Sequence, residues 1–232
     1  MRDHLQQSLG YQFTDPNLLT QALTHKSFAN EQRTTDNERL EFLGDSVLQL
    51  VISHELVRRY PRWSEGLLSK FRAVLVSESG LSQLARQLNL GPHLLIGKGE
   101  EAGNGRDKAS ILANAMEALF AAIYLDAGAK GFKAVQKTIL TLVTPQMDAQ
   151  EESFAYDDVK TDLQEWVQRF KLGEISYQLL SETGPDHEKH FVMGLEVNGK
   201  LVGKGEGKNK KTAEQQAAFH ALKALKQAPA GA

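Results

Sequence analysis

The spacing of apolar residues changes once along this chain, and that change limits the possible folds more than any other feature. Up to about residue 146, apolar residues recur every three to four positions, as on the buried face of an α-helix. After residue 156 they alternate over short stretches, as in β-strands with one buried face. We therefore expect an all-α domain over 1–146, a linker over the acidic stretch 147–156, a small α+β domain over 157–227 and a tail over 228–232.

Helices in the first domain can be placed by their spacing and by the absence of internal proline. They are expected over residues 37–60, 64–76, 78–88, 107–126 and 130–143. Glycine-rich loops at 91–92 and 97–105 separate some of these segments. No strand is expected in this half of the chain.

The second domain is predicted to run helix, three strands, helix. The helices are expected over residues 158–170 and 209–227, and the strands over 174–181, 191–197 and 200–205. Asn198-Gly199 is a preferred two-residue turn between antiparallel strands. This α-β-β-β-α order predicts a three-stranded antiparallel sheet with both helices on one face.

Composition excludes several classes of protein. The chain has no cysteine, which excludes disulfide scaffolds, thiolate zinc sites, iron–sulfur clusters and thiol nucleophiles. The first ten residues, MRDHLQQSLG, lack the apolar stretch of a secretory signal. The most apolar helical stretch, residues 118–125, is far shorter than the roughly 20 residues of a membrane span. We expect a soluble, cytoplasmic protein.

Acidic residues form a pattern on the predicted helix 37–60. Glu38, Glu41 and Asp45 are three and four residues apart and so share one face of an otherwise apolar helix. Carboxylates on a buried face repel one another and lose hydration, so they need a positive partner. Arg39 lies about 100° around the helix and could neutralise at most one of them.

A second predicted helix repeats this pattern. Within residues 110–120, only Ser110, Asn114 and Glu117 interrupt an apolar surface, and they share one face. Two helices that bring oxygen ligands together favour a hard cation, Mg²⁺ or Mn²⁺, and metal-assisted phosphodiester hydrolysis. The alternative is that these are surface acids held by salt bridges.

The end of the chain is basic although the whole chain carries a net charge of −2. From residue 199 to 226, seven lysines stand against two glutamates, a local balance of +5. Lys208, Lys210 and Lys211 lie at a predicted helix N-terminus, where they would suit a phosphate group. An ordinary solvated lysine face is the alternative.

Polar residues on the predicted helix 158–170 could bind the ribose hydroxyls of an RNA duplex. Thr161, Gln164 and Gln168 share one face, with Glu165 beside them. His187 lies on the loop between the first two strands and could enter a neighbouring minor groove. These residues and the three lysines predict shape-selective binding of double-stranded RNA.

Several segments resemble one known family. Residues 37–46, NERLEFLGDS, resemble the signature of the ribonuclease III endonuclease domain, and residues 22–27, ALTHKS, resemble an element that precedes it. Residues 111–125 resemble its second acidic helix. The first helix of the second domain, the loop 184–187 and the segment 203–214, GKGEGKNKKTAE, resemble a double-stranded-RNA-binding domain. The order of domains is that of bacterial ribonuclease III.

The resemblance implies a Mg²⁺-dependent endoribonuclease acting in ribosomal and messenger RNA processing. It would cut both strands of double-stranded RNA to leave 5′-phosphate and 3′-hydroxyl ends with short 3′ overhangs. The implied metal ligands are Glu41, Asp45, Asn114 and Glu117, and Mn²⁺ would substitute for Mg²⁺. Glu38 joins the catalytic acids, and Glu65 is a further acid at the edge of the catalytic valley. No membrane and no organic cofactor is implied.

The resemblance also implies a homodimer, in which Phe42 is either a knob that enters the partner or an ordinary core aromatic. One position departs from the family pattern, because Asn114 stands where well-known members carry aspartate. An amide brings no charge and cannot act as a base, so one alternative is a dimer that binds double-stranded RNA without cutting it. The other alternative, a small-molecule phosphohydrolase, leaves the lysine-rich tail unexplained.

Overall fold

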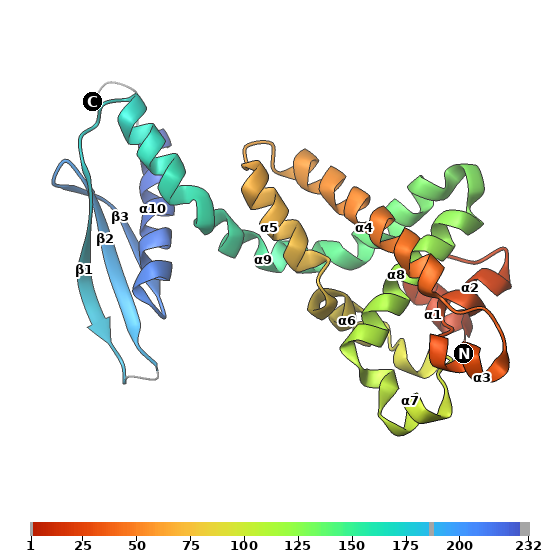
Figure 1. Ribbon diagram of the computed structural model, residues 1–232. Coiled ribbons are helices and arrows are strands. Elements are labelled where there is room, and N and C mark those ends of the chain that lie inside the picture. The colour runs from red at the N-terminus through yellow and green to blue at the C-terminus, as the bar shows by residue number, and fades with distance from the viewer. Residues whose placement is uncertain (1, 186–187, 228–232) are drawn as a thin grey trace. The chain divides into compact units, whose positions relative to one another are not determined.

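The computed structural model describes residues 2–185 and 188–227 (Figure 1). The chain forms two compact units, one up to Asp148 and the other from Ala149 onward. The division falls inside the long helix α9 (Gly131–Arg169). The segment 147–156, which we expected to be a linker, is therefore helical, and α9 continues past Pro145.

The N-terminal unit is all-α, as predicted. Its helices are α1 (Arg2–Leu9), α2 (Pro16–Ala22), α3 (Lys26–Gln32), α4 (Glu38–Arg59), α5 (Glu65–Leu75), α6 (Glu78–Gln87), α7 (Lys98–Ala102), α8 (Ala109–Asp126) and the first part of α9. Short 3₁₀ turns span Gly91–His93, Gly105–Asp107 and Gly128–Lys130. The expected helices are confirmed with ends within two residues, except that the one expected over 130–143 is part of α9.

Serine side chains mark where two of these helices begin. The Ser64 hydroxyl accepts a hydrogen bond from the Leu67 backbone N–H at the start of α5, and Ser77 accepts one from Gly80 at the start of α6. Such caps satisfy N–H groups that have no partner inside the helix. They explain why both helices begin at the expected residues.

Helix α8 is the central core helix of this unit. Most of it is buried, including Leu112, Met116 and Phe120. By length and composition it is apolar enough to cross a membrane, but 61% of it is buried inside the structure. Helices α4 and α6 pack against it. The apolar surface of α8 is therefore explained by the core of the helical unit.

The C-terminal unit has the predicted α-β-β-β-α order. Strands β1 (Ile175–Thr183), β2 (His190–Val197) and β3 (Lys200–Gly207) form an antiparallel sheet in that order, and α10 (Lys210–Gln227) follows. Asn198 and Gly199 both have positive φ angles, 51° and 74°, which confirms the expected hairpin turn. The last turns of α9 share one core with β2 and α10.

Helix α10 packs on β3 almost backbone to backbone. A β-carbon at Gly203 would lie 2.3 Å from the Ala217 carbonyl oxygen, and one at Gly205 would lie 2.2 Å from the Ala217 nitrogen. Larger residues at these glycines would push the helix off the sheet. The glycines of β3 and the alanines of α10 therefore fix where the helix and its N-terminal lysines lie.

Candidate functional site

The two acidic helices of the sequence meet at one close crossing. A β-carbon at Gly44 on α4 would lie 1.8 Å from the backbone carbonyl oxygen of Glu117 on α8. Only glycine permits this approach. Glu41 and Asp45 lie on either side of Gly44 along α4, so both are brought close to Glu117.

The carboxylates at this crossing influence one another. Burial, followed by the negative charges of Asp45 and Glu41, raises the pKa of Glu117 to about 7. Burial and then Glu38 raise the pKa of Glu41, while Lys26 and a hydrogen bond with Asn114 act in the opposite direction. Among the residues that the structure describes, no cation shifts the pKa of Glu117, so its charged neighbours at the crossing are the acids Asp45 and Glu41.

Glu38 lies at the rim of this acidic cluster, which we define as Glu41, Asp45 and Glu117. Its carboxylate forms an ion pair with Lys26 at 3.4 Å, and both side chains are more than half exposed. Lys26, rather than Arg39, therefore supplies the neighbouring positive charge. Lys26 was not predicted as a partner of Glu38, although it lies in the ALTHKS segment.

Two further residues at the cluster were missed. The Gln49 side chain donates to both oxygens of Asp45, at 2.9 and 3.0 Å, and so restrains that carboxylate. Gly44 permits the helix crossing itself. A glycine within an otherwise apolar helix is a recognisable signal of close packing. Gln49 carries no comparable signal in the sequence.

Glu65 lies away from the acidic cluster of its own chain. It is the first residue of α5, and its Oε1 accepts a hydrogen bond from the Ser69 hydroxyl at 2.7 Å. It lines a pocket with Ser53 of α4 and Arg72 of α5. Ser53 is two helical turns beyond Asp45, a rise of about 12 Å. The structure thus does not bring Glu65 together with the other acids.

The residues at the crossing fit a hard divalent cation by their chemistry. Glu41, Asp45 and Glu117 offer carboxylates and Asn114 an amide oxygen, which are ligands that Mg²⁺ accepts. Among residues 2–185 and 188–227, no three acidic or histidine side chains already converge closely enough to hold an ion. Binding would therefore require these side chains to rotate towards one point, with relief of their repulsion as the driving force.

The raised pKa of Glu117 predicts how stability should depend on pH. Its pKa is about 7 in the folded chain against an ordinary 4.5, so the folded state binds more protons between these values. Stability of the metal-free protein should therefore fall as the pH rises from about 4.5 through 7. Glu117→Gln should remove this contribution.

The measurement is thermal melting by circular dichroism without metal. Wild type and Glu117→Gln should melt at similar temperatures near pH 4.5, and the variant should melt higher at pH 8. Mg²⁺ should then raise the melting temperature of the wild type more than that of the variant. If the melting temperatures of the wild type and the variant change with pH in parallel over the whole range, the raised pKa of Glu117 is contradicted.

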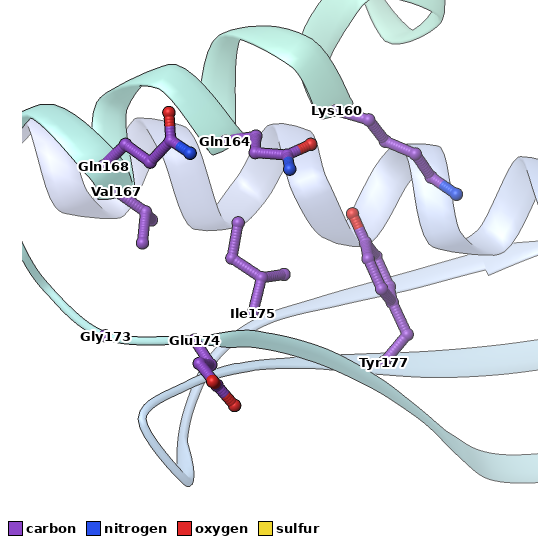
Figure 2. A pocket seen from close by; sticks show the side chains of 8 residues that line it. All are labelled: Lys160, Gln164, Val167, Gln168, Gly173, Glu174, Ile175 and Tyr177. Atoms are coloured by element: carbon purple, nitrogen blue, oxygen red, sulfur yellow. The ribbon is translucent and has the colours of Figure 1, made fainter.

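Polar residues of α9 line a groove in the C-terminal unit. Gln164 and Gln168 border a pocket of about 440 Å³ whose other walls include Lys160, Ile175 and Tyr177 (Figure 2). Glu165 is exposed on the same helix. The structure thus brings both glutamines to one groove. The Thr161 side chain and the whole of His187 lie outside the described residues.

The predicted lysine group stands at the start of α10. Lys208, Lys210 and Lys211 are all exposed, and the Asn209 side chain accepts a hydrogen bond from the Thr212 N–H at 2.9 Å, which caps the helix. The Lys210 ammonium lies 5.9 Å from the centre of the Phe191 ring. Cations at a helix N-terminus are unfavourable for the helix, whereas an external anion would be stabilised there. These three exposed lysines, which we call the lysine cluster, therefore lie together at the N-terminus of α10.

Comparisons with known proteins cover both units. A family model described as Ribonuclease-III-like matches residues 15–147, and one described as double-stranded RNA binding motif matches residues 159–225. A curated protein named Ribonuclease 3, from Caldanaerobacter subterraneus subsp. tengcongensis, is 48% identical over 227 residues, which cover 97% of this chain and 98% of that protein. A Ribonuclease 3 from Bacillus cereus is 45% identical and covers 96% of this chain and 90% of its own length.

A solved structure is similar to the N-terminal part of the chain. It is the nuclease domain of ribonuclease III from Campylobacter jejuni, described for structural flexibility in the region involved in dimer formation. It is 45% identical with a TM-score of 0.58, and the match covers 62% of this chain and 96% of that one.

Proposed function

The chain belongs to the ribonuclease III family, and from that membership we propose its metal, its site residues, its products and its assembly. It is an endoribonuclease specific for double-stranded RNA. The observation that carries this conclusion is the full-length match, which spans the nuclease unit and the RNA-binding unit together. A small-molecule phosphohydrolase would have no use for the second unit.

The family generally uses Mg²⁺, and Glu41, Asp45, Asn114 and Glu117 would hold it in this chain, with Mn²⁺ as a substitute. Bound there, the ion would activate water and stabilise the charge that develops at phosphorus. The chain's own part is positional: Gly44 holds α4 against α8, and Gln49 restrains Asp45. Cleavage would leave 5′-phosphate and 3′-hydroxyl ends with short 3′ overhangs.

Asn114 has a role in this site that does not require a carboxylate. Its side chain forms a hydrogen bond with Glu41, which opposes the rise in the pKa of that residue. It therefore helps to keep Glu41 ionised and oriented, while the three carboxylates supply the negative charge. The presence of Glu41, Asp45 and Glu117 favours a cleaving enzyme over a dimer that binds double-stranded RNA without cutting it.

A homodimer is supported by the outer face of α4. Phe42 is 80% exposed, so its interpretation as a core aromatic of its own chain is wrong. Leu50 and Val57 are exposed on the same side of the helix. Exposed apolar side chains in a row are typical of an interaction surface. We infer that this face of α4 binds a second copy, with Phe42 as its most protruding residue.

The C-terminal unit would bind the RNA duplex. Double-stranded RNA presents phosphates and 2′-hydroxyls rather than readable base edges. The lysine cluster would bind the phosphates, and Gln164, Glu165 and Gln168 would contact ribose hydroxyls. Because its relatives are bacterial enzymes, we place the protein in the cytoplasm, in the processing of ribosomal and messenger RNA.

Incubation of the full chain with three substrates of one sequence tests this function. With Mg²⁺, end-labelled double-stranded RNA should be cut to short duplexes, while single-stranded RNA and double-stranded DNA should stay intact. A chelator should stop cleavage but leave duplex RNA binding measurable by gel shift. Binding without cleavage at any Mg²⁺ or Mn²⁺ concentration would instead support the non-cleaving dimer.

A further inference from the structure

An ion pair joins the two helices of the C-terminal unit beside the lysine cluster. The Lys160 ammonium on α9 lies 2.5 Å from Oε2 of Glu214 on α10. The two side chains are 38% and 27% exposed, so the pair is only partly shielded from solvent. Fifty-four positions separate the two residues in the chain.

Glu214 would otherwise interact with the lysine cluster. It follows Lys211 by three residues and Lys210 by four, and residues at these spacings are neighbours on a helix surface. A carboxylate there can bind either ammonium group and reduce the positive charge offered to a phosphate. In the described part of the chain, however, Glu214 pairs with Lys160, and none of the three clustered lysines forms an ion pair.

Lys160 is itself held in place by Tyr177. Its ammonium lies 4.8 Å from the centre of the Tyr177 ring, on the wall of the groove shown in Figure 2. An aromatic ring attracts a cation placed over its face. Burial and then the charge of Glu214 raise the pKa of Tyr177 to about 12, so the ring stays neutral at physiological pH. Two separate contacts therefore keep Lys160 beside Glu214.

We propose that Lys160 is a positioning residue for RNA binding, which holds Glu214 away from Lys210 and Lys211 and so keeps these two lysines available to phosphates. This inference rests on the proposed function, because it assumes that the lysine cluster binds duplex RNA. It assigns no RNA contact to Lys160 itself. Its effect on affinity therefore passes entirely through Glu214.

A double-mutant cycle on the full chain tests the inference. Affinity for a short RNA duplex is measured in chelator, where no cleavage occurs, at several salt concentrations. Lys160→Met should weaken binding about fivefold at 0.15 M salt and reduce the salt slope by about 1, the loss of one phosphate contact. Glu214→Gln should bind as tightly as the wild type or more tightly, and the double variant should return to within about twofold of the wild type.

Lys223→Met is the matched control, because it removes one exposed lysine of α10 that lies nine positions beyond Glu214. Adding Glu214→Gln to Lys223→Met should change the affinity for duplex RNA no more than Glu214→Gln changes it in the wild type. If Lys160→Met binds normally, or if the double variant stays as weak as Lys160→Met, the inference is wrong. If Lys160→Met does not fold by circular dichroism, Glu214→Gln alone decides, since weaker binding by that variant would overturn the proposal. A wild type that does not bind duplex RNA would instead contradict the proposed function.

Discussion

Glu117→Gln should reduce cleavage of double-stranded RNA at least about a hundredfold and leave duplex affinity in chelator unchanged. A bound metal supplies several kcal/mol of stabilisation to the transition state, and each 1.4 kcal/mol is worth tenfold in rate. Glutamine keeps the shape of the side chain but removes the charge that would hold the ion. Single-turnover cleavage and gel-shift binding on the same preparation separate the two effects.

Glu78→Gln is a suitable control for that experiment. Glu78 is an exposed first-turn residue of α6, outside the acidic cluster, so its change should leave the cleavage rate within about twofold. Near-normal cleavage by Glu117→Gln would remove Glu117 from the metal site. Loss of duplex binding by that variant would instead show a general structural defect.

Gly44→Ala should lower the free energy of unfolding by about 3 kcal/mol and abolish cleavage. The added β-carbon would lie 1.8 Å from the carbonyl oxygen of Glu117, and neither backbone can move without separating α4 from α8. Overpacking at a rigid contact typically costs about 1–3 kcal/mol, and this contact is at the severe end. Urea unfolding followed by circular dichroism gives the stability, and the duplex assay gives the activity.

Gly66→Ala provides the comparison for that variant. Gly66 lies in the first turn of α5, and a β-carbon there would meet no atom within 4 Å. Alanine favours helix over glycine, so this variant should be as stable as the wild type or more stable. Equal stability of the two alanine variants would mean that α4 and α8 are not in direct backbone contact at Gly44.

The helices and the hairpin could be predicted because their signals are local. Periodic apolar residues, serine caps and the Asn198-Gly199 turn act over a few residues. The end of the helix expected over 130–143 was not predictable in the same way. Pro145 and the acidic stretch after it suggest a break, but α9 continues through both. Proline weakens a helix locally, and neighbouring turns can still support it.

The acidic cluster could be predicted only in part. Because helical spacing is regular, the sequence places Glu41 and Asp45 on one face of the predicted helix 37–60 and Glu117 on a second predicted helix. It does not give the separation of α4 and α8, which depends on Gly44. In the sequence, Glu214 stands out only as one of the two negative charges in the basic segment 199–226. Its pairing with Lys160 arises from tertiary packing between residues far apart in the chain.

The close contact between α10 and β3 has a consequence for the energetics of association. Because Gly203 and Gly205 meet the backbone of α10 directly, the helix that carries Lys210 and Lys211 sits on a stiff support with little room to shift. Binding an RNA duplex then has to immobilise the lysine side chains but not the helix beneath them. Preorganisation of this kind leaves more of the electrostatic attraction as net affinity.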